Sequence, residues 1–210
     1  MELVILMNAN FSKRFSAYII DILIISVICN ILLVVIPKSN NYKKLSDNLN
    51  EIAQNYGDKL TSNPENIDIT IYKNYIDEVA PISYQMEKES FINKIIIIVV
   101  YILYYVVYQF KNNGQTLGKK LMKIKVEKEN GQLQINDLLF RSFIVNSVLS
   151  GLISVILLFT TKDMNYLYAS EIISIIFSTA ILISGLMCLI RKDKKTLQDC
   201  LTKTCVVEVG

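Results

Sequence analysis

Apolar residues gather in four long runs along this chain, and polar segments separate the runs. They cover residues 15–36, 91–110, 138–160 and 166–190. A helix that crosses a lipid bilayer needs roughly 20 predominantly apolar residues, so each run predicts a transmembrane helix. Pro37 ends the first run. Only the short polar piece TKDMN separates the third run from the fourth, which predicts a tight helical hairpin.

The composition supports a membrane protein. The chain has 210 residues, 52% of them hydrophobic, and a mean hydropathy of +0.37, which is too apolar for an ordinary soluble domain. The first run is too long for the apolar core of a signal peptide and has no small-residue cleavage site after it, so we expect it to remain as a helix. We therefore predict a single all-α membrane domain over residues 1–210, with four transmembrane helices.

Positive charges are unevenly distributed among the connecting segments. The loop at 111–137 and the tail at 191–210 are rich in lysine, and Lys13 and Arg14 precede the first run. Residues 38–90 instead carry six Lys against nine Asp or Glu. Because Lys and Arg accumulate in cytoplasmic loops, we expect both termini, the loop and the tail in the cytoplasm and residues 38–90 outside.

The extracytoplasmic segment at 38–90 is an insertion between the first two predicted helices. Leu45, Leu49, Ile52 and Tyr56 have helical spacing, and Pro64 should break the helix that they predict. The following stretch IDITIYK alternates like a strand, and a short helix is expected after it. We predict a small cap; the alternative is a partly disordered loop.

The cytoplasmic segments predict a small collar of short helices and strands. LGKKLMKI has the spacing of a short helix on the membrane surface. KIKVE and QLQI alternate on either side of Asn130 and Gly131, a dipeptide typical of two-residue β-hairpins. The tail adds another short helix, KKTLQDCLTKT, and the strand-like run TCVVEV, which could extend the hairpin.

Several function classes find no support in the residues. The chain lacks HExxH, GxSxG and P-loop motifs, so we expect no enzyme and no cofactor. It has no histidine, and Cys200 and Cys205 alone are at most half of a zinc site, so we expect no metal centre and reduced, unpaired thiols. Contact with the lipid bilayer accounts for the basic residues, and no nucleic-acid partner is expected.

Three charged residues, Arg14, Asp21 and Asp199, are the candidate functional residues. A carboxylate near or inside the bilayer costs several kcal/mol unless it is paired or hydrated, so Asp21 needs a partner or a function. Arg14 and Asp21 are two helical turns apart, about 10 Å along the axis. Arg141, at the start of the third run, is an alternative partner for Asp21. We therefore predict a charge network in which Asp21 pairs with Arg141 and Arg14 pairs with Asp199.

These pieces together resemble the RDD family of bacterial membrane proteins. The resemblance rests on KRFSAYIID, GQTLGKKLMKIKV, the arginine of LLFRSF and the closing LQDCLTKTCVV, in that order. The family is named after one Arg and two Asp, here Arg14, Asp21 and Asp199. It implies a multi-pass protein of the bacterial inner membrane that is related to transport, with some members implicated in cation–proton exchange. Gln198 stands where the family often has histidine, and the long segment at 38–90 is unusual.

The charged residues leave three interpretations open. In the first, the ion pairs hold the collar to the transmembrane helices and no substrate binds. In the second, Asp21 binds a monovalent cation or a proton in a hydrated vestibule, and Arg14 or Arg141 competes with it. A transporter with so few helices is expected to be a homo-oligomer. In the third, the chain is a scaffold or an accessory or immunity-type protein that binds a partner through its outer cap.

Overall fold

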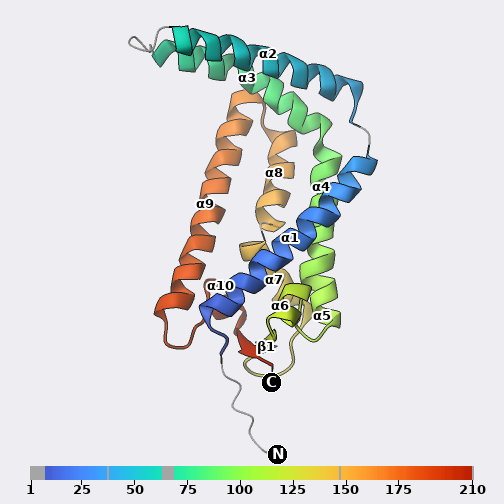
Figure 1. Ribbon diagram of the computed structural model, residues 1–210, viewed down its shortest axis with the longest axis vertical. Helices are drawn as coiled ribbons and strands as arrows, with labels where there is room; N and C mark the ends of the chain where they lie inside the picture. The colour runs from blue at the N-terminus through green and yellow to red at the C-terminus, as the bar shows by residue number, and fades with distance from the viewer. Residues whose placement is uncertain (1–7, 37, 63–68, 147, 210) are drawn as a thin grey trace, which may run out of the picture.

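The structure is a computed structural model that describes residues 8–36, 38–62, 69–146 and 148–209 (Figure 1). Most of these residues are helical, and a two-stranded sheet lies at one end of the helices. We call the end with the sheet the collar end. We call the opposite end, which the paired helices α2 and α3 cover, the hairpin end (Figure 1).

Three helices among the described residues are long and apolar enough to cross a membrane. They are α1 (Phe11–Val35), the continuous helix Phe91–Lys111 and α9 (Asp163–Ile190). The second of these consists of α4 (Phe91–Ile102), the π-helical segment η1 (Leu103–Tyr108) and α5 (Gln109–Lys111). A fourth crossing results if α7 (Ile135–Val145) and α8 (Val148–Thr160), which are bent by 68° relative to each other, form one broken span. The third predicted helix is therefore broken near its middle.

The long helices expose their apolar side chains to the surroundings. Only 11% of the most apolar window of α1 or of α9 is buried within the protein. Val34 on α1 is 85% exposed, and Ile190 at the end of α9 is 80% exposed. A helix that is apolar on all sides and unburied is stable in lipid, where these side chains meet acyl chains. The structure thus supports a multi-pass membrane protein.

The described part of the segment at the hairpin end is helical except at its two ends. α2 (Asn40–Ser62) includes the predicted stripe from Leu45 to Tyr56, and Tyr56 is buried and donates a hydrogen bond to Glu78 of α3 (Ile69–Glu89), with 2.9 Å between the oxygens. The predicted strand over IDITIYK is wrong from Ile69 onward, because α3 begins there. Pro64 and the break expected around it lie outside the described residues.

The collar contains α6 (Leu117–Leu121), β1 (Ile124–Lys128), α10 (Leu197–Thr202) and β2 (Thr204–Glu208). The predicted hairpin at Asn130 and Gly131 is wrong. β1 pairs instead with the tail strand β2, antiparallel and with Val126 opposite Val206, and residues 132–134 form no strand. Gly131 has a φ of 94°, so the chain turns there but does not return along β1.

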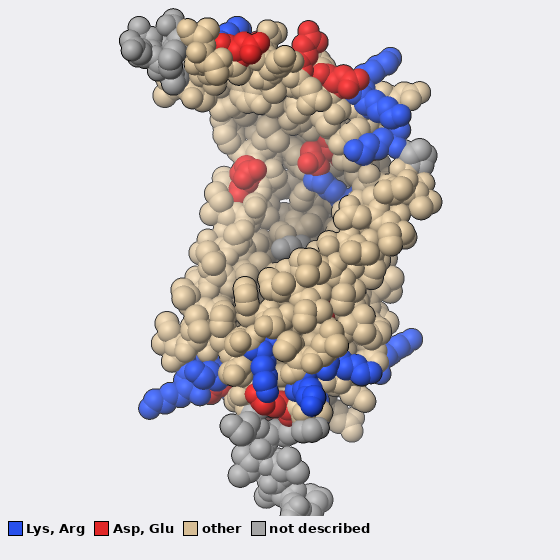
Figure 2. Space-filling model, viewed as in Figure 1, with Lys and Arg blue, Asp and Glu red and all other residues tan. Residues whose placement is uncertain are grey.

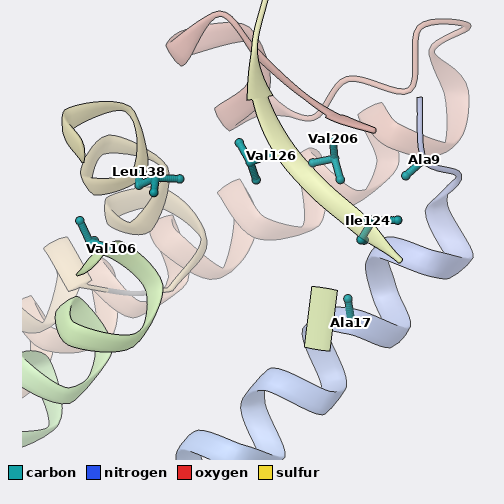
Figure 3. Packing of buried hydrophobic residues seen from close by; sticks show 7 residues of the cluster. All are labelled: Ala9, Ala17, Val106, Ile124, Val126, Leu138 and Val206. Atoms are coloured by element: carbon teal, nitrogen blue, oxygen red, sulfur yellow. The ribbon is translucent and has the colours of Figure 1, made fainter. Parts of the chain in front are cut away.

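A small apolar core attaches the collar to the transmembrane helices (Figure 3). Ala17 of α1 lies close to Ile124 of β1, and Val126 and Val206 of the sheet point toward Leu138 of α7 (Figure 3). Burying a side chain such as Leu138, which is 1% exposed, contributes about 1.5–3 kcal/mol. This core fixes the collar beneath α1 and α7, where the charged residues lie.

Candidate functional site

Asp199 is the centre of a buried ion-pair cluster at the collar end. Its side chain is fully buried, and Oδ2 lies 2.7 Å from Nη1 of Arg14. Its other oxygen, Oδ1, pairs with Nη1 of Arg141. Asp199 also accepts a hydrogen bond from the backbone N of Thr196, 3.1 Å away, and so caps the first turn of α10. The predicted pair of Arg14 with Asp199 is present, whereas Arg141 pairs with Asp199 and not with Asp21.

The two arginines extend this cluster into the sheet. Arg14 donates from Nε to the carbonyl of Ala9 at 3.0 Å and from Nη2 to the carbonyl of Val206 at 3.2 Å. Arg141 also donates to the hydroxyl of Thr204, at the start of β2. The cluster, which we call the Asp199 clamp (Arg14, Arg141 and Asp199), therefore joins α1, α7 and α10 to β2.

The charges of the Asp199 clamp keep its carboxylate ionised. Burial alone would raise the pKa of Asp199, but the guanidinium charges of Arg141 and Arg14 outweigh this effect and lower the pKa to about 2. Two arginines against one carboxylate leave the clamp with one net positive charge. The clamp is therefore a joint between elements that also presents positive charge to its surroundings.

Asp21 lies in a different environment, two turns further along α1. It is 2% exposed, and all three of its described hydrogen-bond donors are neutral. Oδ1 accepts from the hydroxyl of Tyr104 at 2.6 Å and from the backbone N of Gly118 at 2.7 Å, and Oδ2 accepts from the hydroxyl of Thr116 at 2.6 Å. Within the described chain, no Lys or Arg nitrogen lies within 4.0 Å of this carboxylate. The predicted Asp21–Arg141 pair is therefore wrong.

Gly118 is the residue that lets the loop approach Asp21 so closely. A Cβ atom at this position would lie 2.2 Å from the carbonyl oxygen of Ala17 and 2.7 Å from Oδ1 of Asp21. Thr116, the N-cap of α6, supplies a second donor to the same carboxylate. The sequence QTLGKK carries these donors, but only the folded arrangement of α6 against α1 shows that they bind Asp21.

A cavity of about 380 Å³ lies between α1, α7 and α9 at the collar end, and it borders both charged groups. Its polar lining includes the following side chains: Arg14, Asp21, Gln109, Lys119, Arg141, Asn146, Ser184, Thr196 and Gln198. Phe11, Leu138 and Ile181 are among its apolar lining. Thr196 is 7% exposed as a residue, and its hydroxyl has no acceptor for its hydrogen among the described residues. These polar side chains give water or a small charged solute hydrogen-bonding partners within a lining that is otherwise mostly apolar.

Lys119 is the functional candidate that the sequence analysis did not single out. Its side chain lines the cavity, and its ammonium group donates a hydrogen bond to Oε1 of Gln109 at 3.3 Å. Burial lowers the pKa of Lys119 to about 8, because this cost outweighs the favourable charge of Asp21. Sequence analysis did not single out Lys119 because several other lysines surround it in the loop at 111–137. All of them were attributed to the orientation of the protein in the membrane.

The depressed pKa of Lys119 predicts how stability depends on pH. The unfolded chain holds this proton up to its ordinary pKa of 10.5, whereas the folded protein releases it near pH 8. The unfolded state therefore binds more protons between these values, and the free energy of unfolding gains a contribution that rises with pH across this window. Lys119→Met lacks the contribution. We expect its melting temperature to exceed that of the wild type at pH 7 and the difference to shrink between pH 8 and 10.5. If the difference in melting temperature between the two proteins stayed the same from pH 7 to pH 10.5, Lys119 would not have the lowered pKa described here.

Comparison with known proteins gives one match. A family model described as the RDD family matches residues 8–203 of this chain. No curated protein and no solved structure matches it. The matched region includes all four residues of the predicted charge network, Arg14, Asp21, Arg141 and Asp199.

Proposed function

The chain belongs to the RDD family, and on that basis we propose that it exchanges a small monovalent cation for protons across the membrane. Asp21 is the proposed binding carboxylate, and the collar-end cavity is the proposed binding chamber. By the lysine distribution, the collar end faces the cytoplasm of a bacterium, and the protein works as a homo-oligomer in its inner membrane.

The proposal rests on one observation about Asp21. Its carboxylate is buried, and no Lys or Arg nitrogen among the described residues lies within 4.0 Å of it. An isolated ion costs several kcal/mol when it is moved out of water, even after relaxation. The three neutral hydrogen bonds offset part of this cost, at about 1.5–3 kcal/mol each for bonds to a charged group. A carboxylate accepts about four hydrogen bonds, so Asp21 keeps acceptor capacity, chiefly on Oδ2. A cation that enters the cavity would neutralise the carboxylate of Asp21.

Lys119 supplies the coupling in this proposal. Below its pKa of about 8, its ammonium group is a resident cation in the same cavity as Asp21 and competes with an entering ion. When the ammonium group gives its proton to water, the neutral amine no longer repels the ion. The proton leaves Lys119 as the cation binds near Asp21, so one positive charge replaces another. Such competition makes cation occupancy fall at low pH.

The Asp199 clamp favours a second candidate function, that of a membrane scaffold. Its carboxylate is fully buried and paired with two arginines, and it connects elements from both ends of the sequence. Such a joint needs no solute. In this alternative, Asp21 only anchors α6 to α1, and the surfaces that bind a partner lie elsewhere on the protein.

Cation flux into proteoliposomes separates these two functions. Vesicles containing the protein and a pH dye receive Na⁺, K⁺ or Li⁺, and exchange raises the internal pH as protons leave. We expect Asp21→Asn to slow this change by about tenfold or more, because the binding charge is lost while Gly118 and Tyr104 keep an acceptor.

Asp193→Asn is the matched control for this experiment, because Asp193 is a carboxylate on the exposed tail that pairs only with Arg191 and the backbone of Lys195 among the described residues. The control should transport like the wild type, and both variants should elute as the wild type does in size-exclusion chromatography. If no cation moves protons with the wild type, or if Asp21→Asn transports normally, the scaffold function replaces exchange.

A further inference from the structure

A second cavity, of about 470 Å³, lies between α1, α4, α8 and α9 toward the hairpin end. Figure 2 shows this face of the molecule hollowed between α1 and the α2–α3 hairpin. Ser174 and Ser178 of α9 line the cavity and are exposed, so it is open. We call it the outer cavity and the one beside Asp21 the inner cavity.

Hydroxyl groups dominate the polar lining of the outer cavity. Three serines of α9, Ser170, Ser174 and Ser178, recur every four residues and so share one helix face, and Ser154 contributes from α8. Lys94, inside the second long helix, lies 2.6 Å from Oε2 of Glu87, so its charge is neutralised. The polar part of an otherwise mostly apolar lining therefore presents chiefly neutral oxygens, which are ligands that hard cations prefer.

The two cavities are adjacent. Tyr18, Tyr105, Val145 and Asn146 line both of them. Tyr105 is 4% exposed. These four residues, which we call the septum, therefore lie between the inner cavity, which Asp21 lines, and the outer cavity, which lies nearer the hairpin end.

Two helix irregularities coincide at the septum. Tyr105 belongs to η1, where the helix is π-helical, a feature that is rare and is frequent at functional sites. Val145 and Asn146 end α7 where it is bent by 68° relative to α8. Helix breaks of this kind are tolerated within membranes where they line a cavity. Both deviations thus occur where a path between the cavities would have to open.

We propose that the outer and inner cavities are two halves of one cation route and that the septum is its gate. This inference rests on the proposed exchange function and extends it to the opposite side of the membrane. A partly hydrated monovalent cation enters from the hairpin end, exchanges water for serine and tyrosine oxygens, and passes the septum to reach Asp21. In this structure the septum lies between the outer cavity and the inner cavity that Asp21 lines.

Cysteine accessibility tests the route without requiring transport. In a background with Cys29, Cys188, Cys200 and Cys205 replaced by serine, reporters are placed along one helix, α9. Ser174→Cys reports on the outer cavity, and Gly185→Cys reports on the inner cavity, where a Cβ atom has room beside Phe11 at 3.9 Å. Ile176→Cys is the control: it is 58% exposed and lines neither cavity.

The probe is a membrane-impermeant, positively charged methanethiosulfonate reagent added on the hairpin side. Because only an ionised thiol in water reacts, we expect Ser174→Cys to react about tenfold faster than Ile176→Cys and Gly185→Cys to stay unmodified. Adding Tyr105→Ala should speed the reaction of Gly185→Cys about tenfold by opening the septum. Val145→Ala replaces Tyr105→Ala if the latter does not assemble.

Two results would overturn the route. One is equal reactivity of Ser174→Cys and Ile176→Cys, which would mean that lipid fills the outer cavity. The other is an unmodified Gly185→Cys in the opened variant. Because labelling needs no ion flux, a protein that shows the route but fails the proteoliposome assay refutes exchange while the path stands. A protein that exchanges ions but fails the labelling refutes only the route.

Discussion

Asp199→Ala should destabilise the folded protein by about 3–5 kcal/mol, the usual cost of removing one partner from a buried ion pair. The substitution leaves the guanidinium groups of Arg14 and Arg141 without the carboxylate that neutralises them. It also removes the acceptor that caps α10 at Thr196. Water cannot restore these interactions cheaply, because Asp199 is fully buried.

The measurement is unfolding of the purified protein in mild detergent, followed by circular dichroism. Asp193→Ala is the control. It also removes a carboxylate from an arginine pair in the tail, but on an exposed site where such pairs contribute little. A melting temperature of Asp199→Ala close to that of Asp193→Ala would show that the Asp199 clamp is not a structural joint.

The Asp199 clamp also predicts how the stability of the folded protein changes in acid. The folded pKa of Asp199, about 2, lies below the ordinary value of 3.8, so the unfolded chain binds more protons between these values. The contribution of Asp199 to stability is therefore complete above pH 4 and is lost as the pH falls toward 2. Near neutral pH this contribution is constant, so any change of stability with pH there comes from other groups such as Lys119.

Hydropathy predicted the long helices, because it depends only on the composition within one segment. Three of the four predicted long helices, the helical stripe from Leu45 to Tyr56 and the tail strand lie where the pattern placed them, whereas the third predicted helix is broken into α7 and α8. The strand predicted from IDITIYK failed because β-branched residues favour strands in isolation, whereas packing of α3 against α2 decides in context. The Asn130–Gly131 hairpin failed for a similar reason: β2, far along the chain, is the better partner for β1.

The candidate site could be predicted only in part. Arg14 and Asp199 were recognisable because charges at the edge of an apolar run need partners, and their pair is present. The environment of Asp21 depends on three neutral donors, one of them a backbone N–H of Gly118, and no sequence pattern encodes where that loop folds back. Lys94 was overlooked because a single lysine near a helix end hardly changes the hydropathy of the run.

The central claim is that Asp21 binds the cation, and the second large effect that we expect is the release of a proton when the cation binds. In the proposed exchange, a cation that binds near Asp21 makes the ammonium group of Lys119 less favourable and drives its proton into solution. Because the pKa of Lys119 is about 8 before the cation binds and lower afterward, release should be largest near pH 7.5. At pH 6 the amine stays protonated in both states, and at pH 10 it is neutral in both.

Proton release on cation binding therefore tests the account most directly. Purified protein in weakly buffered detergent at about pH 7.5 receives Na⁺, K⁺ or Li⁺ at constant ionic strength, and a pH indicator records the protons released. We expect up to one proton per chain from the wild type, none from Asp21→Asn, and none from Lys119→Met although it still binds the cation. Release from Asp21→Asn equal to that from the wild type would contradict the claim that Asp21 is the binding carboxylate.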